Sequence, residues 1–168
     1  AVRPDQAQTL WRLKRRQADK PLILMGATVE DLLQEVAVSC HLEVEAMAQR
    51  HWPGALTLVL PAREGGVGCH LNPGGTTLGC RIPACEQARA LLQISGPLAT
   101  TSANRSGEPA STTAAEAARY FPDVAQLGPQ PWSQHSGQAS TVLVWVEDGR
   151  WRMVRRGVVI PAGVEVFE

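Results

Sequence analysis

The sequence has no long hydrophobic run. In its 168 residues no apolar stretch reaches the roughly 18 residues that a membrane-crossing helix needs. Residues 1–8 are polar and a basic segment follows them, which is unlike a secretory signal. We therefore expect a cytoplasmic protein without a membrane partner, built as a single domain over residues 1–168.

The sequence also lacks a net charge, because 16 Lys and Arg residues balance 16 Asp and Glu residues. A neutral protein has no global field that would draw it to nucleic acid or membrane. The distribution is uneven, since six bases and two acids lie within residues 1–20. Lys14 and Lys20 are the only lysines of the chain, and both lie there. A local basic face on a neutral protein favours a specific anionic ligand.

Cysteine is scarce, and none of the four forms a Cys-x-x-Cys pair. A chain of this size needs no disulfides to fold. Cys69, His70, Cys80 and Cys85 could be interpreted as a zinc set, but their spacing is unlike the usual paired knuckles. We therefore predict buried free thiols and no metal site.

Several catalytic motifs are missing. The glycine-rich residues 64–75 contain no Gly-x-x-x-x-Gly-Lys-Ser/Thr pattern, which excludes a P-loop, and they are predicted to form a mobile surface loop. There is no Gly-x-Ser-x-Gly elbow and no evident Ser-His-Asp set. The scattered histidines are interpreted as structural or surface residues. They are His41, His51, His70 and His135.

What the sequence does contain is an alternation of helical and strand patterns. Capping boxes begin two of the helices, at Thr28 and Thr113, and Asp148-Gly149 is typical of a hairpin turn. The pattern predicts an α/β fold with a twisted, mixed, open sheet and flanking helices. The expected helices are 5–17, 28–37, 42–51, 85–93 and 113–120, and the expected strands are 21–25, 56–60, 77–82, 97–101, 141–146 and 151–155.

Two bases near the end of the first helix are candidate phosphate ligands. Lys14 and Arg16 point to different sides of an ideal helix, so they can hold one ligand only where the helix unwinds. The following Asp19-Lys20-Pro21 favours such unwinding. The planar fork of Arg and the compact charge of Lys together suit a polyphosphate. A solvated basic surface is the alternative interpretation.

A second candidate element follows the apolar residues 97–99. Thr101, Ser102 and Asn104 come at the carboxyl end of this strand, where α/β folds usually place ligands. Ser102 and Asn104 share a side if the segment stays extended. The alternative is a Ser/Asn turn that bonds its own backbone. The basic helix and this loop together favour a phosphate-bearing ligand, ATP.

Five motifs follow one another along essentially the whole chain, and in this order they resemble the YrdC family, the threonylcarbamoyl-AMP synthases. The motifs are Lys14-Arg15-Arg16 with Lys20-Pro21-Leu22, then Trp52-Pro53-Gly54-Ala55-Leu56-Thr57, then Ser102-Ala103-Asn104 with Ser106-Gly107, then Ser140-Thr141-Val142, and finally Arg156-Gly157. The resemblance implies a YrdC-like open sheet. It also implies that L-threonylcarbamoyladenylate is formed from L-threonine, bicarbonate and ATP with Mg²⁺, and that pyrophosphate is released.

The resemblance further implies a place in tRNA modification. The product would pass to downstream tRNA threonylcarbamoyl-transfer proteins, and tRNA or double-stranded RNA is an expected partner. Arg81 would lie near threonine, and Ser140 and Arg156 would close over the ligands. The implied site residues are Lys14, Arg16, Ser102 and Asn104 as catalytic and ATP-binding, with Thr101, Arg81, Ser140 and Arg156 as further binding residues.

The sequence departs from the family pattern at its start. The family normally opens with a strand carrying Pro-Thr-Asp/Glu-Thr and a Tyr-Gly-Leu-Gly-like turn, which helps to hold threonine. This sequence has neither motif, so we expect the first strand and the first helix of the family fold to be absent from it. Met25 replaces a histidine of some members. Two alternatives stay open: an RNA-binding module of the same fold without catalysis, and a carbamoyl-handling relative like the hydrogenase maturation proteins.

Overall fold

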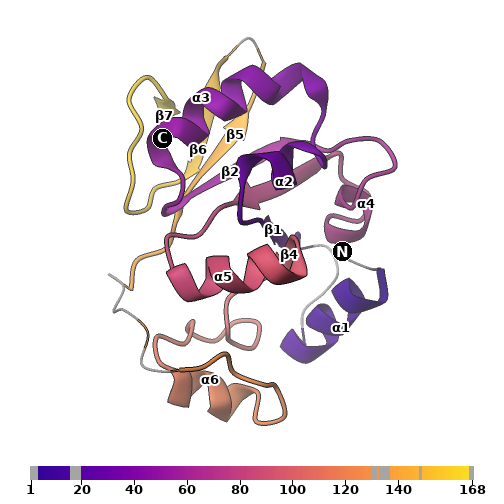
Figure 1. Ribbon diagram of the computed structural model, residues 1–168, viewed down its shortest axis with the longest axis vertical. Helices are drawn as coiled ribbons and strands as arrows, with labels where there is room; N and C mark the ends of the chain where they lie inside the picture. Colours follow the sequence, from indigo (N-terminus) through magenta and orange to yellow (C-terminus); the bar gives the residue numbers. More distant parts are fainter. Residues whose placement is uncertain (1–3, 16–19, 130–131, 133–136, 148, 167–168) are drawn as a thin grey trace.

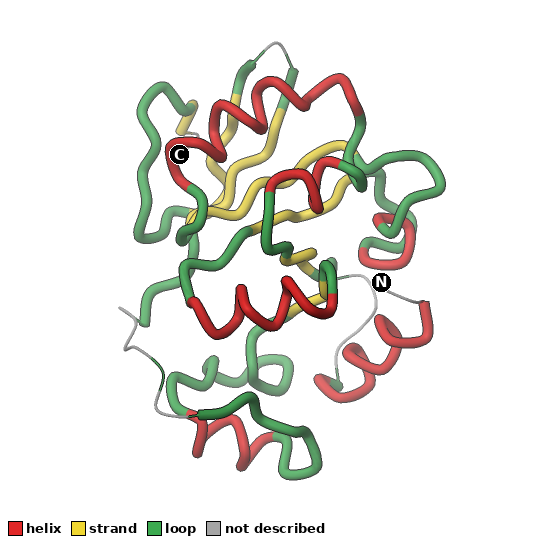
Figure 2. The backbone as a smooth tube through the Cα atoms, in the orientation of Figure 1, coloured by secondary structure: helices red, strands yellow, loops and turns green. Residues whose placement is uncertain are grey.

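A computed structural model describes residues 4–15, 20–129, 132, 137–147 and 149–166 (Figures 1 and 2). The helices are α1 (Pro4–Lys14), α2 (Val29–Leu33), the 3-10 turn η1 (Val38–Cys40), α3 (His41–His51), α4 (Gly68–Leu71), α5 (Glu86–Ser95) and α6 (Ala114–Tyr120). The strands are β1 (Ile23–Met25), β2 (Leu56–Pro61), β3 (Thr77–Arg81), β4 (Leu98–Thr100), β5 (Thr141–Trp145), β6 (Trp151–Arg155) and β7 (Glu165–Val166).

The strands form one mixed sheet in the order β4-β1-β3-β2-β5-β6-β7. The pairs β1/β3, β2/β5 and β6/β7 are parallel, and the other three pairs are antiparallel. The prediction of an α/β fold with a mixed open sheet and flanking helices is therefore confirmed. Figure 1 shows α3 and α6 at opposite ends of the molecule, and Figure 2 shows long loops on both sides of α6.

One face of the sheet is an apolar core. Alternate residues of neighbouring strands point to this face, and Leu58, Cys80 and Leu143 are completely buried there. Val44 of α3 and Leu32 of α2 belong to the same core. Figure 1 shows α2 and α3 in front of the sheet, so these two helices cover the apolar face.

The opposite face carries small and polar groups among apolar residues. Gly79 pairs with Ile23 on one side and Val59 on the other. A methyl group at Gly79 would lie 2.6 Å from the Ile23 Cδ1 atom, so glycine allows this close approach. Arg81 follows two residues later on the same face, opposite the end of β2 that carries Thr57. This face, rather than the leucine face, offers polar groups to a ligand.

Both predicted capping boxes are present. The Thr28 side chain accepts from the Asp31 N–H, and Thr113 accepts in the same way from Glu116. The first box begins a shorter helix than predicted, because α2 ends at Leu33. The prediction that Val36 and Ala37 continue this helix is wrong. Val36 forms a β-bridge with Ala62, and the Ala37 N–H donates to the Pro61 carbonyl. The backbone of both residues thus pairs with the end of β2 and does not continue the helix.

Residues 64–75 are more ordered in structure than their composition predicts. The prediction of a surface loop is wrong for residues 68–71, which form α4. Leu71 is completely buried, and its carbonyl accepts a hydrogen bond from the Leu22 N–H. The side chain of Glu35 accepts from the Val67 N–H, 2.9 Å away, and fixes the entry to α4. No helix among the described residues is long and apolar enough to span a membrane.

All four cysteines are free thiols. Cys40 and Cys80 are buried as predicted, whereas Cys69 is exposed and Cys85 is half-buried. The Cys69 thiol donates to the Gly66 carbonyl at 3.1 Å. Burial raises the pKa of the Cys80 thiol far above its ordinary value of 9.0, and Cys40 and Glu35 raise it further.

The buried Cys80 thiol predicts a loss of stability in alkali. Above pH 9.0 the unfolded chain releases the Cys80 proton while the folded chain keeps it, so the free energy of unfolding falls as the pH rises. One such group contributes a slope of up to about 1.4 kcal/mol per pH unit. Urea unfolding at about pH 8 and about pH 10 should show a shallower fall for Cys80→Ala than for the exposed-site control Cys69→Ala. Equal slopes in the two variants would contradict this assignment.

A second stability prediction concerns Gly157. Its N–H donates to the Thr141 hydroxyl at 3.0 Å, and the chain here crosses the backbone before β5. A methyl group at Gly157 would collide with the Ala139 carbonyl oxygen and the Thr141 backbone nitrogen. Because backbone atoms cannot rotate away, Gly157→Ala should lower the free energy of unfolding by about 1–3 kcal/mol, measured in urea. Gly128→Ala is the control, since no atom lies within 4 Å of its added methyl group.

Candidate functional site

The site begins where α1 ends. The helix stops at Lys14, earlier than predicted, because Arg15 takes a left-handed conformation with φ 50°. The Arg15 N–H donates to the Arg12 carbonyl at 3.0 Å and closes the last turn. The unwinding expected after Lys14 is therefore present. Arg16, the second predicted phosphate ligand, lies outside the described residues.

Lys14 joins the two elements predicted to converge. Only 4% of its surface is exposed, and its Nζ donates to the carbonyl oxygens of Ser102 at 2.5 Å and Asn104 at 2.8 Å. It also donates to the Asn104 Oδ1 at 2.6 Å, while the Ser102 Oγ lies 3.4 Å away. Burying an ammonium ion costs several kcal/mol unless polar atoms replace water around it. These loop oxygens supply that replacement.

The loop itself is a turn held by its own side chains. Ser102 Oγ donates to Asn104 Oδ1 at 2.7 Å, and the Asn104 N–H donates to the Ser102 carbonyl at 3.0 Å. Asn104 Nδ2 donates to the Glu108 carbonyl at 2.5 Å. The loop therefore forms the predicted Ser/Asn turn, and it also contacts Lys14 of α1. The loop is preorganised before any ligand binds.

The strand pairing decides which site residues meet. β4 runs antiparallel to β1, so Thr100 pairs with Ile23 while Arg81 pairs with Met25 at the other end of β1. Half-buried Thr101 leads from β4 into the loop. The structure therefore brings Thr101, Ser102 and Asn104 to the end of the sheet where β1 begins. Arg81 lies at the other end of β1, beside Met25, which is two residues beyond Ile23.

A second polar cluster forms around Ser140, which is 7% exposed. Its hydroxyl lies 2.9 Å from the hydroxyl of buried Thr57. Arg155 Nη2 donates to the same Ser140 hydroxyl at 2.9 Å, and Arg155 Nε donates to the Ser140 carbonyl at 2.9 Å. The two donors of one guanidinium thus fix both the backbone and the side chain of Ser140.

Arg81 stands at the edge of this cluster. Its Nε donates to the Gly54 carbonyl at 2.9 Å, which orients the half-buried guanidinium. Burial lowers the pKa of Arg81, and the positive charge of Arg155 lowers it further. Arginine nevertheless stays protonated at neutral pH. Two neighbouring positive charges favour the binding of an anion beside them.

The arginine that contacts Ser140 is Arg155. The role implied for Arg156, closing over the ligands, stays a prediction. Both arginines are exposed, and no hydrogen bond of the Arg156 side chain is among those described. Strand alternation gives no signal for Arg155, because a register shift between Val142 and Leu143 brings Arg155 opposite Val142 and off the buried face of Trp151 and Met153. Thr57 was also missed as a site residue, although it ends a motif that the sequence analysis used.

The residues of the site do not form a resident metal centre. Among the described residues, no group of three or more His, Cys, Asp or Glu side chains could hold a metal ion. Lys14, Arg81 and Arg155 are cationic, and the oxygens of the loop already accept from Lys14. This donor set suits phosphate or carboxylate and does not suit Mg²⁺, which prefers carboxylate and water oxygens.

Known proteins resemble this chain in both sequence and fold. The profile of the Sua5/YciO/YrdC family, described as telomere recombination, matches residues 1–157. A threonylcarbamoyl-AMP synthase from Idiomarina loihiensis is 42% identical over 118 residues, which are 69% of this chain and 63% of that protein.

Two solved structures of Sua5 from Pyrococcus abyssi resemble this chain. A doubly substituted variant has a TM-score of 0.86 at 30% identity and covers 98% of this chain and 52% of that one. The complex with L-threonine has a TM-score of 0.82 at 34% identity, over 91% of this chain and 44% of that one. The chain thus spans between 44% and 63% of the length of these three relatives. With a family profile matched over nearly its whole length, the chain belongs to the Sua5/YciO/YrdC family.

Proposed function

We propose that this chain forms threonylcarbamoyl-AMP from L-threonine, bicarbonate and ATP, with release of pyrophosphate. The observation that carries the proposal is the buried Lys14 ammonium, which holds the Ser102–Asn104 loop on the end of α1. Relatives that bear the name threonylcarbamoyl-AMP synthase support the choice of reaction. Membership of the family supports it as well.

The proposed reaction needs alignment and charge stabilisation rather than a protein nucleophile. Threonine carries a carbamate, formed when its amine nitrogen bonds the carbon of bicarbonate and a C–O bond breaks with loss of water. One carbamate oxygen forms a bond to the α-phosphorus of ATP, the bond between that phosphorus and the bridging oxygen breaks, and pyrophosphate leaves with the electron pair. Positive side chains and N–H donors lower this barrier by holding both anions in line.

ATP is proposed to bind against the loop and α1. Lys14 Nζ already donates to three loop oxygens, so its first task is to shape the loop. Because the Lys14 residue is only 4% exposed, its charge then acts on the phosphates at short range and in a medium of low dielectric. Mg²⁺ is proposed to arrive as part of the substrate, bound to the phosphates of ATP.

Threonine and bicarbonate are proposed to bind at the second cluster. Arg81 and Arg155 together present two guanidinium groups on one face of the sheet, and such forks bind carboxylates well. A relative from Pyrococcus abyssi has been solved with L-threonine bound, which supports an amino-acid site in this fold. The product is proposed to serve tRNA modification in the cytoplasm, with tRNA and threonylcarbamoyl-transfer proteins as its partners.

The first prediction of this proposal is a co-substrate requirement. Pyrophosphate release from ATP by the purified chain should need both L-threonine and bicarbonate. Lys14→Ala should lower kcat/KM at least about a hundredfold, because it removes a charge and leaves the loop oxygens without their donor. Lys20→Ala is the matched control, since it is the only other lysine and its side chain is exposed. Release that is independent of threonine, or an equal effect of the two substitutions, would contradict the proposal.

The second prediction separates two neighbouring arginines. Both side chains are exposed, but Arg155→Gln breaks two hydrogen bonds to Ser140, whereas Arg156→Gln breaks none of the hydrogen bonds described. We expect kcat/KM for L-threonine to fall about tenfold more in Arg155→Gln than in Arg156→Gln, because one charged hydrogen bond is worth that much. Steady-state kinetics with varied threonine at saturating ATP tests this. The reverse order would assign the role to Arg156.

A further inference from the structure

Arg105 directly follows Asn104 in the loop of residues 102–106. Its side chain reaches away from the loop. Its Nη1 donates to the Leu13 carbonyl in the last turn of α1, 3.3 Å away. Its Nη2 donates to the Tyr120 carbonyl at the end of α6, 3.2 Å away. A single guanidinium therefore joins the loop to the ends of two helices.

Both helix ends need such donors. The last carbonyls of a helix have no partner within it, and a positive charge nearby also interacts favourably with the helix dipole. The loop meets this need for α1, because Arg105 bonds the Leu13 carbonyl and the Ser106 N–H bonds the Lys14 carbonyl at 3.0 Å. The loop is thus the C-terminal cap of α1.

The capping is reciprocal. While the loop satisfies the carbonyls of α1, the Lys14 ammonium of α1 satisfies the carbonyls of Ser102 and Asn104. The bonds run in both directions between segments about 90 residues apart in sequence. Moving the end of α1 would therefore move the Lys14 charge and the loop oxygens together.

The planar fork of Arg105 suits this position. The guanidinium carbon lies 5.7 Å from the centre of the ring of Phe121, the residue that follows α6. The ring thus supports the group while two of its nitrogens donate to two carbonyls. A lysine has one nitrogen and no plane, so it cannot bond both carbonyls in the same geometry. Charge alone does not reproduce the contact.

We propose that Arg105 is a positioning residue for ATP, which sets the Lys14 ammonium and the Asn104 side chain in register by tying the loop to α1 and α6. This inference rests on the proposed function. Arg105 acts through other residues, because its donors point to Leu13 and Tyr120. Its loss should therefore weaken the use of ATP and leave the threonine half of the reaction in place.

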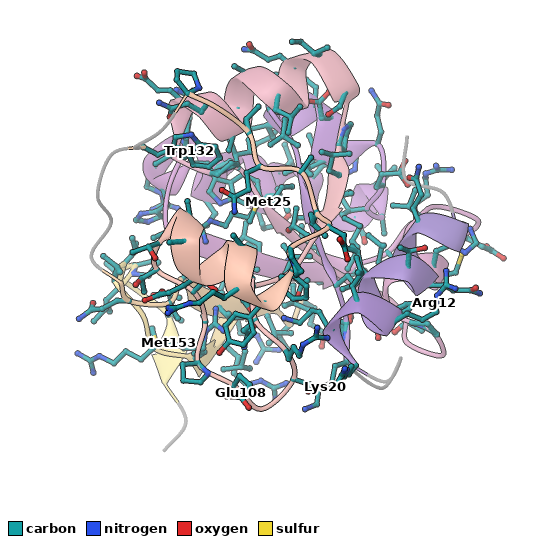
Figure 3. All side chains as sticks on the ribbon, turned by 90° about the horizontal axis from the view of Figure 1, so that it is seen from below. Arg12, Lys20, Met25, Glu108, Trp132 and Met153 are labelled. Carbon is teal, nitrogen blue, oxygen red and sulfur yellow. The ribbon has the colours of Figure 1, made fainter. Side chains whose placement is uncertain are left out.

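The experiment compares Arg105→Lys and Arg105→Ala with wild type and with the control Arg12→Lys. The Arg12 side chain is exposed in the same last turn of α1 (Figure 3). Among the side-chain hydrogen bonds described, it donates only to the Thr9 hydroxyl of its own helix. We expect the KM for ATP to rise about tenfold in Arg105→Lys, the scale of one charged hydrogen bond, with the KM for L-threonine within about twofold of wild type. Methylguanidinium should restore part of the ATP affinity of Arg105→Ala and leave Arg12→Lys unaffected.

Hydrogen exchange at the Ser106 amide gives a second readout that needs no activity. In Arg105→Ala this amide should exchange at least about tenfold faster than in Arg12→Lys, because its bond to the Lys14 carbonyl loosens. If wild type releases no pyrophosphate, the proposed reaction fails for this chain, while the amide exchange still decides the role of Arg105. Unchanged exchange, or a KM for threonine that rises as much as that for ATP, would overturn the inference.

Discussion

The candidate site depends on one buried charge. The Lys14 ammonium is nearly inaccessible to water, and the carbonyls of Ser102 and Asn104 replace its hydration shell. A buried ammonium without such acceptors would destabilise the fold, so the charge of Lys14 favours the loop conformation that supplies them. Conversely, Lys14 supplies a donor to both loop carbonyls. The charge and the loop therefore stabilise each other.

The sheet provides the second constraint, through the difference between its faces. Leucines fill the face under α2 and α3, which fixes the register of the central strands, since a shift by one residue would turn the leucines outward. That fixed register places Gly79 beside Ile23 and puts Arg81 on the opposite face. The position of Arg81 thus follows from the packing of a core that it does not touch.

Local features could be predicted from the sequence, whereas long-range pairings could not. The capping boxes at Thr28 and Thr113 and the turn at Ser102 depend on neighbouring residues, and the sequence indicated each of them. The direction of β4 depends on pairing between Ile23 and Thr100, which no local pattern encodes. The prediction that the basic helix and the loop form one ATP site came from the family resemblance and not from periodicity.

The hydrogen bonds of Ser140 show the same limit at the scale of one residue. Arg155 reaches Ser140 because β5 and β6 change register between Val142 and Leu143, which brings Arg155 opposite Val142. Such a bulge cannot be located from the alternation of either strand alone. Once the register is known, the geometry selects the arginine, because one guanidinium can bond the carbonyl and the hydroxyl of Ser140 together. Two arginines are adjacent in the sequence, and the pairing of the strands decides which of them bonds Ser140.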